Sequence, residues 1–258
     1  MEEKNNIMVE TVSQISGNLV SKTAEIATGC PCLGEILGPI VTSGINEVLS
    51  RSLSNMENQR IGIVSKQIEI KIEQRINNGD LPRRNDDFYL RDEYNQTSAS
   101  KLLEETLIKC KQEFEAKKLN YYANFWANVC FENNVSYEDA NSLIALFSTL
   151  SCQQINILTY LASDEKIMMN QWEKYMFSDT KLAPYFTFYT DCLQLYNTRL
   201  AVQPIAVNGG IQVGTPNICI SSSGSLMCKL FELEIKEDDR KRILDQILAI
   251  DSIIKRIK

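Results

Sequence analysis

Three kinds of local motif in this sequence carry residues that could do chemistry: a close cysteine pair, glutamate–lysine pairs and serine–lysine pairs. The cysteine pair, Cys30 and Cys32 around Pro31, could hold a soft metal, accept an acyl group or form a structural turn. A tetrahedral zinc site needs four ligands, and the sequence has no histidine and no second close cysteine pair. We therefore interpret these residues as a turn.

The glutamate–lysine pairs each match half of a metal-dependent nuclease site, in which a carboxylate binds the ion and a lysine steadies the nucleophile. They are Glu69 with Lys71 and Glu234 with Lys236. No aspartate precedes the first pair anywhere in the chain, and Asp191, which precedes the second, falls in a predicted helix. We interpret both pairs as chance matches.

The serine–lysine pairs and the absence of histidine argue against most of the remaining enzyme classes. The S-x-x-K pattern occurs at Ser98, Ser163 and Ser178, but without the S-D-N and K-T-G motifs that accompany it in penicillin-recognising enzymes. A chain without histidine cannot use Ser-His-Asp, Cys-His or two-histidine-carboxylate chemistry. It also lacks the glycine-rich phosphate-binding motifs. We expect no catalytic, cofactor-binding or metal-binding residues, and a protein that is not an enzyme.

Composition and charge favour a soluble protein with a protein partner. The 258 residues are 44% apolar, which suits one large domain or two small ones. A net charge of -6 disfavours binding to nucleic acid or to anionic lipid. The start, residues 1–6, has no basic region followed by an apolar one, and eight scattered cysteines then indicate reduced thiols in the cytoplasm. The most apolar stretch, residues 33–49, is interrupted by charges and a proline, so no transmembrane segment is expected.

Apolar residues at helical spacing predict a mainly α-helical protein. In the first part the residues with this spacing are Ile61, Val64, Ile68, Ile72 and Ile76, with a stop at residues 77–79. We expect an N-terminal helical segment at 1–79, an exposed connection at 80–97 and a helical core at 98–150. Within that core, two helices are expected between 98 and 132, meeting near 113–117.

Two successive capping boxes mark the next helices. Ser136 with Asp139, and Ser151 with Gln154, have the spacing at which a side-chain oxygen accepts a hydrogen bond from an orphan amide and the later residue reciprocates. They predict helices over 137–150 and 152–162.

The region 151–235 is predicted to resemble a winged helix-turn-helix with a small β-hairpin. A further helix is expected over about 190–202, and strands at 206–207 and 211–213 flank a tight Asn208-Gly209-Gly210 turn. Another strand is expected at 217–221 and a helix from Ser225. Helices followed by a hairpin and a helix have the order of a winged helix.

The last segment, 236–258, is predicted to be one helix. It opens with three acidic residues, which stabilise a helix N-terminus. Five isoleucines then recur four and three residues apart, as in a coiled-coil seam. This seam either packs on the body of the protein or pairs with another chain, and it is our candidate partner-binding site: Ile243, Ile247, Ile250, Ile254 and Ile257.

Several helix-packing motifs give the chain a family resemblance. The motifs are Gly38-Pro-Ile-Val-Thr-Ser-Gly-Ile-Asn-Glu-Val-Leu49, Asn58-Gln-Arg-Ile61, Leu102-Leu-Glu-Glu105, Leu119-Asn-Tyr-Tyr-Ala-Asn-Phe-Trp-Ala-Asn128 and Leu150-Ser151. Over roughly residues 38–162 the chain resembles bacterial helical proteins of the abortive-infection alpha (Abi-alpha) type, except that Lys117 or Lys118 stands where an arginine is usual. The resemblance implies a prokaryotic cytosolic protein encoded beside anti-phage genes, with no catalytic residues to carry over.

The function that we expect is a non-enzymatic protein-interaction module, an accessory or effector of bacterial anti-phage defence, which binds a protein partner or itself. One alternative is a winged-helix regulator that binds nucleic acid, which requires five basic residues to gather on one face: Lys181, Arg199, Lys229, Lys241 and Arg242. A second is a membrane-perturbing effector that uses a helix over 33–49, although that helix carries acids on its polar side. A third is an enzyme whose carboxylates or thiols meet in a cleft with shifted pKa values.

Overall fold

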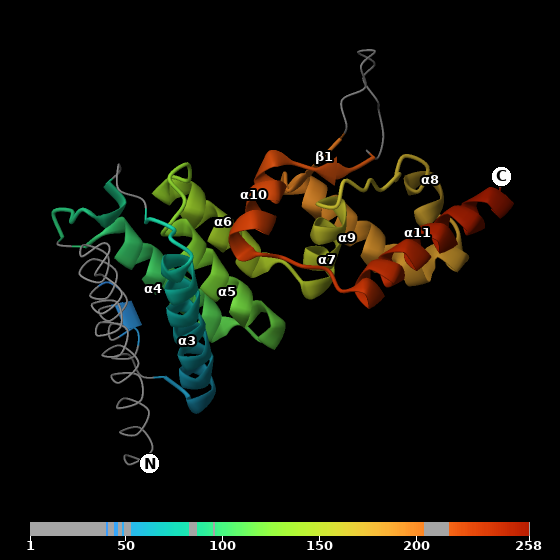
Figure 1. The fold of residues 1–258 in the computed structure, drawn as a ribbon. Helices are drawn as coiled ribbons and strands as arrows, with labels where there is room; N and C mark the ends of the chain where they lie inside the picture. Colours follow the sequence, from blue (N-terminus) through green and yellow to red (C-terminus); the bar gives the residue numbers. More distant parts are fainter. Residues whose placement is uncertain are drawn as a thin grey trace. The chain divides into compact units, whose positions relative to one another are not determined.

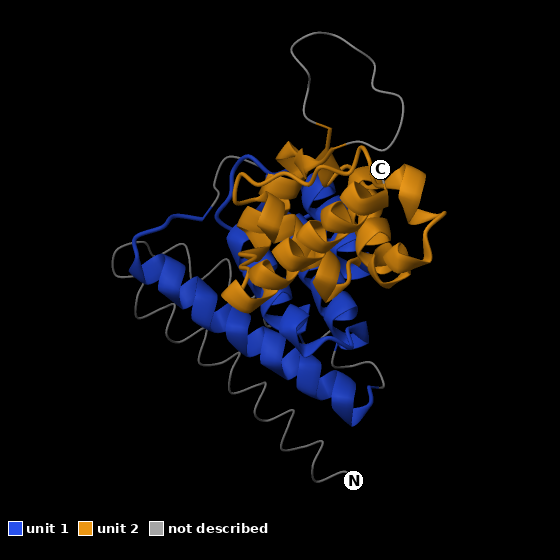
Figure 2. Ribbon diagram, turned by 90° about the vertical axis from the view of Figure 1, so that its right-hand side faces the viewer, with its two compact units in different colours: residues 1–149 blue, residues 150–258 orange. Residues whose placement is uncertain are grey.

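The computed structural model describes residues 40, 44, 45, 48, 53–82, 87–94, 96–203 and 217–257. Within these residues the chain is mainly α-helical, with one two-stranded antiparallel sheet (Figure 1). The chain divides into two compact units, residues 1–149 and residues 150–258 (Figure 2). The predicted mainly α-helical class is thus confirmed for this part of the chain. The predicted turn at 208–210 and its flanking strands lie outside the described residues.

The N-terminal unit is built on α3 (Asn55–Asn77), whose apolar stripe packs on α4 (Ser98–Gln112) and α5 (Ala116–Val129). The isoleucines of α3 predicted from the spacing, Ile61, Ile68 and Ile72, are fully buried. A capping box between Ser54 and Glu57 starts the helix. Gly79, at a φ of +86°, supplies the left-handed turn that follows its end, as the sequence predicted.

Helix α6 (Tyr137–Thr149) completes the helices of this unit by packing on α4 and α5. Trp126 of α5 is fully buried and donates its indole N–H to the carbonyl of Ala99 in α4, at 3.2 Å. The segment predicted to be an exposed connection holds a short helix, η1 (Asp87–Tyr89). Its Phe88 is buried, and the hydroxyl of Tyr89 donates to the carbonyl of Cys130. These two aromatic residues attach the connection to the unit.

The C-terminal unit begins with α7 (Cys152–Leu161), whose N-terminus carries the predicted Ser151–Gln154 capping box. A short α8 (Glu173–Met176), a 3-10 helix η2 (Thr180–Tyr185) and α9 (Phe186–Asn197) follow. The strands β1 (Ala201–Val202) and β2 (Cys219–Ile220) pair in antiparallel register, with Ala201 opposite Ile220. Helices α10 (Ser222–Phe231) and α11 (Glu237–Ile257) complete the unit.

Two predicted helix bounds in this unit are wrong. The helix expected over about 190–202 is α9, which starts at Phe186 and ends at Asn197. It ends early because Arg199 adopts a left-handed φ of +64°, and the following residues turn into β1. The helix expected from Ser225 starts at Ser222, because the hydroxyl of Ser221 accepts a hydrogen bond from the amide of Gly224 and caps it.

Helix α10 approaches the backbone of the residue before β1 closely. A Cβ atom built on Gly224 would lie 2.2 Å from the carbonyl oxygen of Leu200, a distance that real side chains do not tolerate. Ser221 donates its hydroxyl to the carbonyl of Arg199 at 2.6 Å, next to the same contact. Glycine is therefore required at this point of the unit.

Candidate protein interaction surface

The predicted isoleucine seam lies on α11, and the structure buries most of it within the C-terminal unit. Ile243, Ile250 and Ile254 are buried, because α11 packs against α7 and η2. Ile247 is half-buried and Ile257, near the end of the helix, is exposed. Of the two roles that the sequence left open, packing on the body is the one that these three buried residues have. They present no surface to a partner.

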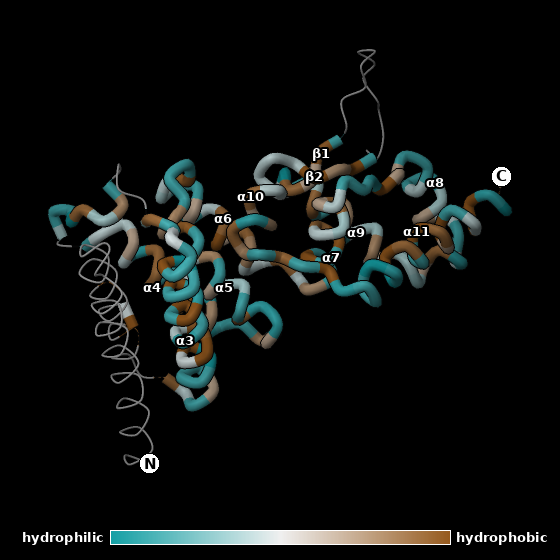
Figure 3. The backbone as a smooth tube through the Cα atoms, viewed as in Figure 1, coloured by the Kyte–Doolittle hydropathy of each residue, from teal (hydrophilic) through white to brown (hydrophobic). Residues whose placement is uncertain are grey.

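Two leucines on the opposite side of α11 remain exposed. Leu244 is 37% exposed and Leu248 is 64% exposed, and they lie one turn apart. Along α11, Figure 3 shows hydrophobic segments alternating with hydrophilic ones. The exposure of these leucines was not predicted from the sequence. One feature of the sequence does point to them. Each directly follows an isoleucine of the seam, so the apolar surface of α11 is wider than one stripe that faces the core.

Charged residues frame the exposed leucines. Helix periodicity places Glu237, Lys241 and Lys255 within about 40° of Leu248 around the helix axis. All three are exposed, and in the part of the chain that the structure describes none of them forms a salt bridge. We call the following residues the α11 face: Glu237, Lys241, Leu244, Leu248, Asp251 and Lys255. It has the composition of a small interaction surface, with an apolar centre and a charged rim.

Contacts at both ends hold α11 in place on its unit. Near its N-terminus the guanidinium of Arg240 donates to Glu165 at 2.7 Å and lies over the ring of Tyr160, 5.6 Å from its centroid. In its C-terminal half Asp251 accepts a hydrogen bond from the indole of the buried Trp172, at 2.9 Å. The helix therefore presents the α11 face in a fixed orientation relative to the rest of its unit.

A second exposed apolar group lies at the start of α9. The rings of Phe177 and Phe186 are both exposed, and they meet edge to face with their centroids 5.6 Å apart. Phe177 also contacts the buried ring of Tyr189, which anchors the pair to the unit. These aromatic residues therefore pack on one side and are open to solvent on the other.

Among the described residues, two groups of buried polar side chains have the chemistry of a reactive site, and the members of each group are paired with one another. In the N-terminal unit, the Lys118 ammonium lies 2.5 Å from the Glu113 carboxylate, which also accepts from the hydroxyl of Tyr122. Burial is the largest single influence and acts to raise the pKa of Glu113, but the hydrogen bonds from Lys118, the Glu115 amide and Tyr122, together with the charge of Lys118, outweigh it and the pKa is lowered. The carboxylate is held as an anion by its lysine, which is an arrangement that stabilises structure rather than one that transfers protons.

The second buried group lies between α7 and α9. The amide of Gln154 donates to the carboxylate of Asp191 at 2.8 Å and to the side-chain oxygen of Gln194 at 2.9 Å. Burial raises the pKa of Asp191, and the hydrogen bond from Gln154 offsets part of that rise. The same glutamine caps α7, so this group joins a helix start to the neighbouring helix.

The described cysteines are poor nucleophiles where their acidity is shifted. Burial raises the pKa of Cys110 and of Cys228 to about 12, and it also raises the pKa of Cys192. A thiol with a raised pKa is protonated near neutral pH and reacts slowly. Cys30 and Cys32, for which three roles were considered, lie outside the described residues.

The structure places the glutamate–lysine pairs and Ser178 as follows. Glu69 and Lys71 are two residues apart on α3, so their side chains point in different directions around the helix and cannot share an ion. Glu234 and Lys236 are exposed between α10 and α11. Ser178 donates its hydroxyl to a backbone carbonyl of α8. Among the described residues no cluster of cysteine, aspartate or glutamate could hold a metal ion.

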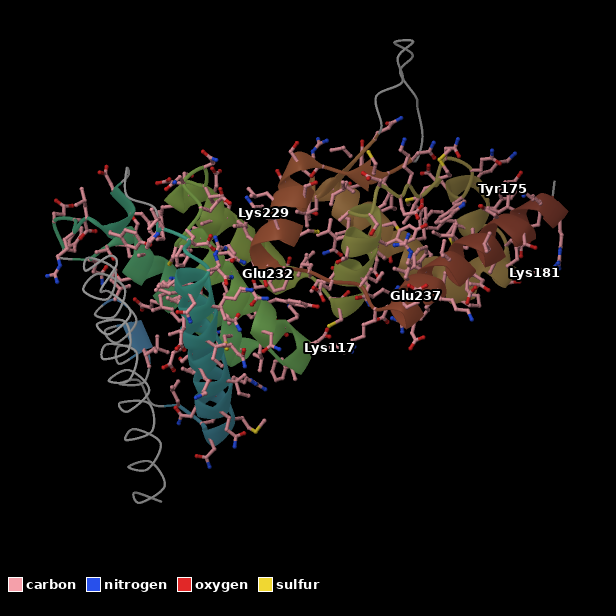
Figure 4. All side chains as sticks on the ribbon, in the orientation of Figure 1. Lys117, Tyr175, Lys181, Lys229, Glu232 and Glu237 are labelled. Atoms are coloured by element: carbon pink, nitrogen blue, oxygen red, sulfur yellow. The ribbon has the colours of Figure 1, made fainter. Side chains whose placement is uncertain are left out.

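The structure offers little support for the nucleic-acid-binding alternative or for the membrane-perturbing one. Helix α9 contains neither lysine nor arginine. Figure 4 shows Lys181 and Lys229 at opposite ends of the C-terminal unit. In the stretch 33–49, the described side chains of Ile40, Ile45 and Val48 are buried rather than free to enter a membrane. Among the described residues, no helix is both long enough and apolar enough to cross a bilayer.

Comparisons with protein-family models, with curated proteins and with solved structures find no match to this chain.

Proposed function

We propose that this protein is a non-enzymatic protein-interaction module that acts as an accessory or effector of bacterial anti-phage defence, and that the α11 face is its contact surface. The observation that supports the proposal most is the exposure of Leu244 and Leu248 on a helix whose other side is buried. Apolar residues at the centre of a charged rim are the composition of surfaces that bind other proteins. The two buried polar groups described above, Glu113 with Lys118 and Gln154 with Asp191, are each paired within their own unit.

The link to defence rests on the resemblance of residues 38–162 to proteins of the Abi-alpha type. In this proposal the C-terminal unit is a winged-helix-like scaffold whose β1–β2 sheet and α10 support packing rather than nucleic-acid binding. The absence of lysine and arginine from α9 favours that role over a DNA-binding one.

A phage challenge with matched variants tests this proposal. Phage should form fewer plaques on bacterial cells that express the intact chain than on cells without it. Leu248→Glu places a charge at the centre of the α11 face and should abolish protection, whereas Leu90→Glu, at a leucine that is also 64% exposed but lies in the N-terminal unit, should not. Both variants must accumulate to the level of the intact chain. Equal protection by the two variants, or none by the intact chain, would contradict the proposal.

A further inference from the structure

The residues of the α11 face are arranged symmetrically about Gln246. Leu244 and Leu248 lie two residues to either side of it, and Lys241 and Asp251 lie five residues to either side. Glu237 and Lys255 lie nine residues to either side. Each of the two outer pairs joins an acid to a base, and the inner pair joins leucine to leucine. All six residues fall within about 60° of Leu248 around the helix axis, so they share one face.

This symmetry makes the face complementary to itself in one orientation. In an antiparallel pair of α11 helices that cross at the level of Gln246 along the helix axis, each residue of the face meets its symmetric counterpart. Glu237 then meets Lys255, Lys241 meets Asp251 and Leu244 meets Leu248 of the other chain. A parallel pair aligns each residue with its own copy and brings like charges together. A twofold axis at Gln246 therefore gives an isologous interface with two identical halves.

We propose that the partner of the α11 face is α11 of a second copy of this chain, bound antiparallel about a twofold axis at Gln246. The inference rests on the proposed function, because it identifies the occupant of that same surface. It adds the identity of the partner, the direction of the two helices and their register.

The side chains concerned are available for these contacts. Glu237 and Lys255 are exposed and form no ion pair within the described residues. Figure 4 shows Glu237 at the start of α11, and Lys181 of η2 lies toward the other end of this helix. Asp251 uses Oδ1 to accept the indole N–H of Trp172, which orients the carboxylate. Its other oxygen can accept a hydrogen bond from the partner's Lys241.

The size of the face predicts a weak dimer. Helix α11 has 21 residues and is about 30 Å long. One helix face of that length buries less than the roughly 1,000 Å² that a stable interface needs. We therefore expect dissociation at concentrations on the order of tens of micromolar. Sedimentation of the purified full chain from about 1 to 300 micromolar covers this range.

Substitution at the centre of the face tests the location of the interface. Leu248→Glu should weaken the dimer at least tenfold, because the new carboxylate meets the partner's Leu244 and is desolvated there. Leu90→Glu, the matched change in the N-terminal unit, should leave the dissociation constant unchanged. A chain that is monomeric at every concentration would overturn the inference. A dimer that Leu248→Glu does not weaken would also overturn it, by placing the interface elsewhere, for example at Phe177 and Phe186.

Charge reversal tests the direction and the register. Glu237→Lys should weaken the dimer about five- to tenfold, since it places a cation opposite the partner's Lys255 in both halves of the interface. Lys255→Glu should do the same, and the double variant should regain the affinity of the intact chain. Two weak single variants without rescue in the double variant would refute the antiparallel register. In a parallel pair the single changes would exchange one like-charge contact for another and have little effect.

The same variants separate failure of this inference from failure of the proposed function. If the intact chain protects cells and Leu248→Glu does not, while the purified chain stays monomeric, the face binds a different protein and only the self-pairing is wrong. If the chain dimerises as predicted but Leu248→Glu still protects cells, the pairing is right and the proposed role of the face in defence is wrong.

Discussion

Removing the charge of Glu113 should destabilise the N-terminal unit strongly, because it removes an anion that pairs with a buried lysine. The side chain of Lys118 is 3% exposed and that of Glu113 is 10% exposed, with 2.5 Å between the charged atoms. Breaking a buried ion pair by neutralising one partner costs about 3–5 kcal/mol. We expect the lower end for Glu113→Gln, about 3 kcal/mol. The Lys118 ammonium keeps its contact with the ring of Phe147 and a long bond to the carbonyl of Ser148, and the glutamine still accepts from Tyr122.

Urea unfolding followed by fluorescence measures this cost. The chain has two tryptophans, and Trp126 lies in the N-terminal unit. A Trp172→Phe background therefore makes Trp126 the only reporter. A loss of about 3 kcal/mol lowers the midpoint by roughly 1–2 M urea. Lys118→Met should also destabilise, and Glu113→Gln combined with Lys118→Met should cost less than the two single changes added together. A cost below about 1 kcal/mol for Glu113→Gln would mean that the pair behaves as a solvent-exposed one and would refute this reasoning.

The pH dependence of the same difference has a definite sign. The pKa of Glu113 in the folded chain lies below its ordinary value of 4.5. A lowered pKa contributes stability that is fully present above the ordinary value and is lost as the pH falls through the folded value. The gap between the intact chain and Glu113→Gln should therefore stay constant from pH 7 down to about 5 and shrink below about 4. A gap that grows on acidification would contradict the assignment.

Three further substitutions have definite expected signs, one destabilising and two stabilising. Gly224→Ala places a methyl group against the carbonyl of Leu200 and should cost about 1–3 kcal/mol by thermal unfolding. Gly62→Ala, on α3 with nothing within 4 Å of the added carbon, should stabilise by about 0.5–1 kcal/mol. Asp191→Asn should stabilise by up to about 1 kcal/mol at pH 7, because burial raises the pKa of Asp191 and the folded chain favours its neutral form, while Gln154 keeps an acceptor. That gain should vanish near pH 3, and a variant equally stabilised at both pH values would contradict it.

Helix starts that depend on local chemistry could be predicted from the sequence. Ser151 and Gln154 form the expected reciprocal hydrogen bonds, and the amide of Asp139 donates to the hydroxyl of Ser136 at 3.0 Å. A cap involves residues only three apart, so the sequence contains both of its halves. The end of α9 could not be predicted in this way. Arg199 adopts a left-handed conformation that its residue type does not favour, and the apolar pattern gives no sign of it.

The candidate surface shows the limit of periodicity more directly. Spacing identified the isoleucine stripe of α11, but it does not say whether a stripe meets its own chain or another one. The structure settles this for Ile243, Ile250 and Ile254 by packing α7 and η2 against them. Leu244 and Leu248 are exposed because no other part of the described chain covers them. Only the tertiary structure shows this, because the spacing of apolar residues does not say which of them are covered.

Zero-length cross-linking tests the proposed pairing of α11 most directly. Glu237 and Lys255 are 18 residues apart on one helix, which separates them by about 27 Å. A carbodiimide link between the two can therefore form only between chains. In the dimer band of the intact chain we predict a cross-linked peptide that joins Glu237 to Lys255. When labelled and unlabelled chains are combined, we also predict cross-linked products of mixed mass. A dimer band that lacks this peptide, or one that joins α11 to a residue outside α11, would contradict it.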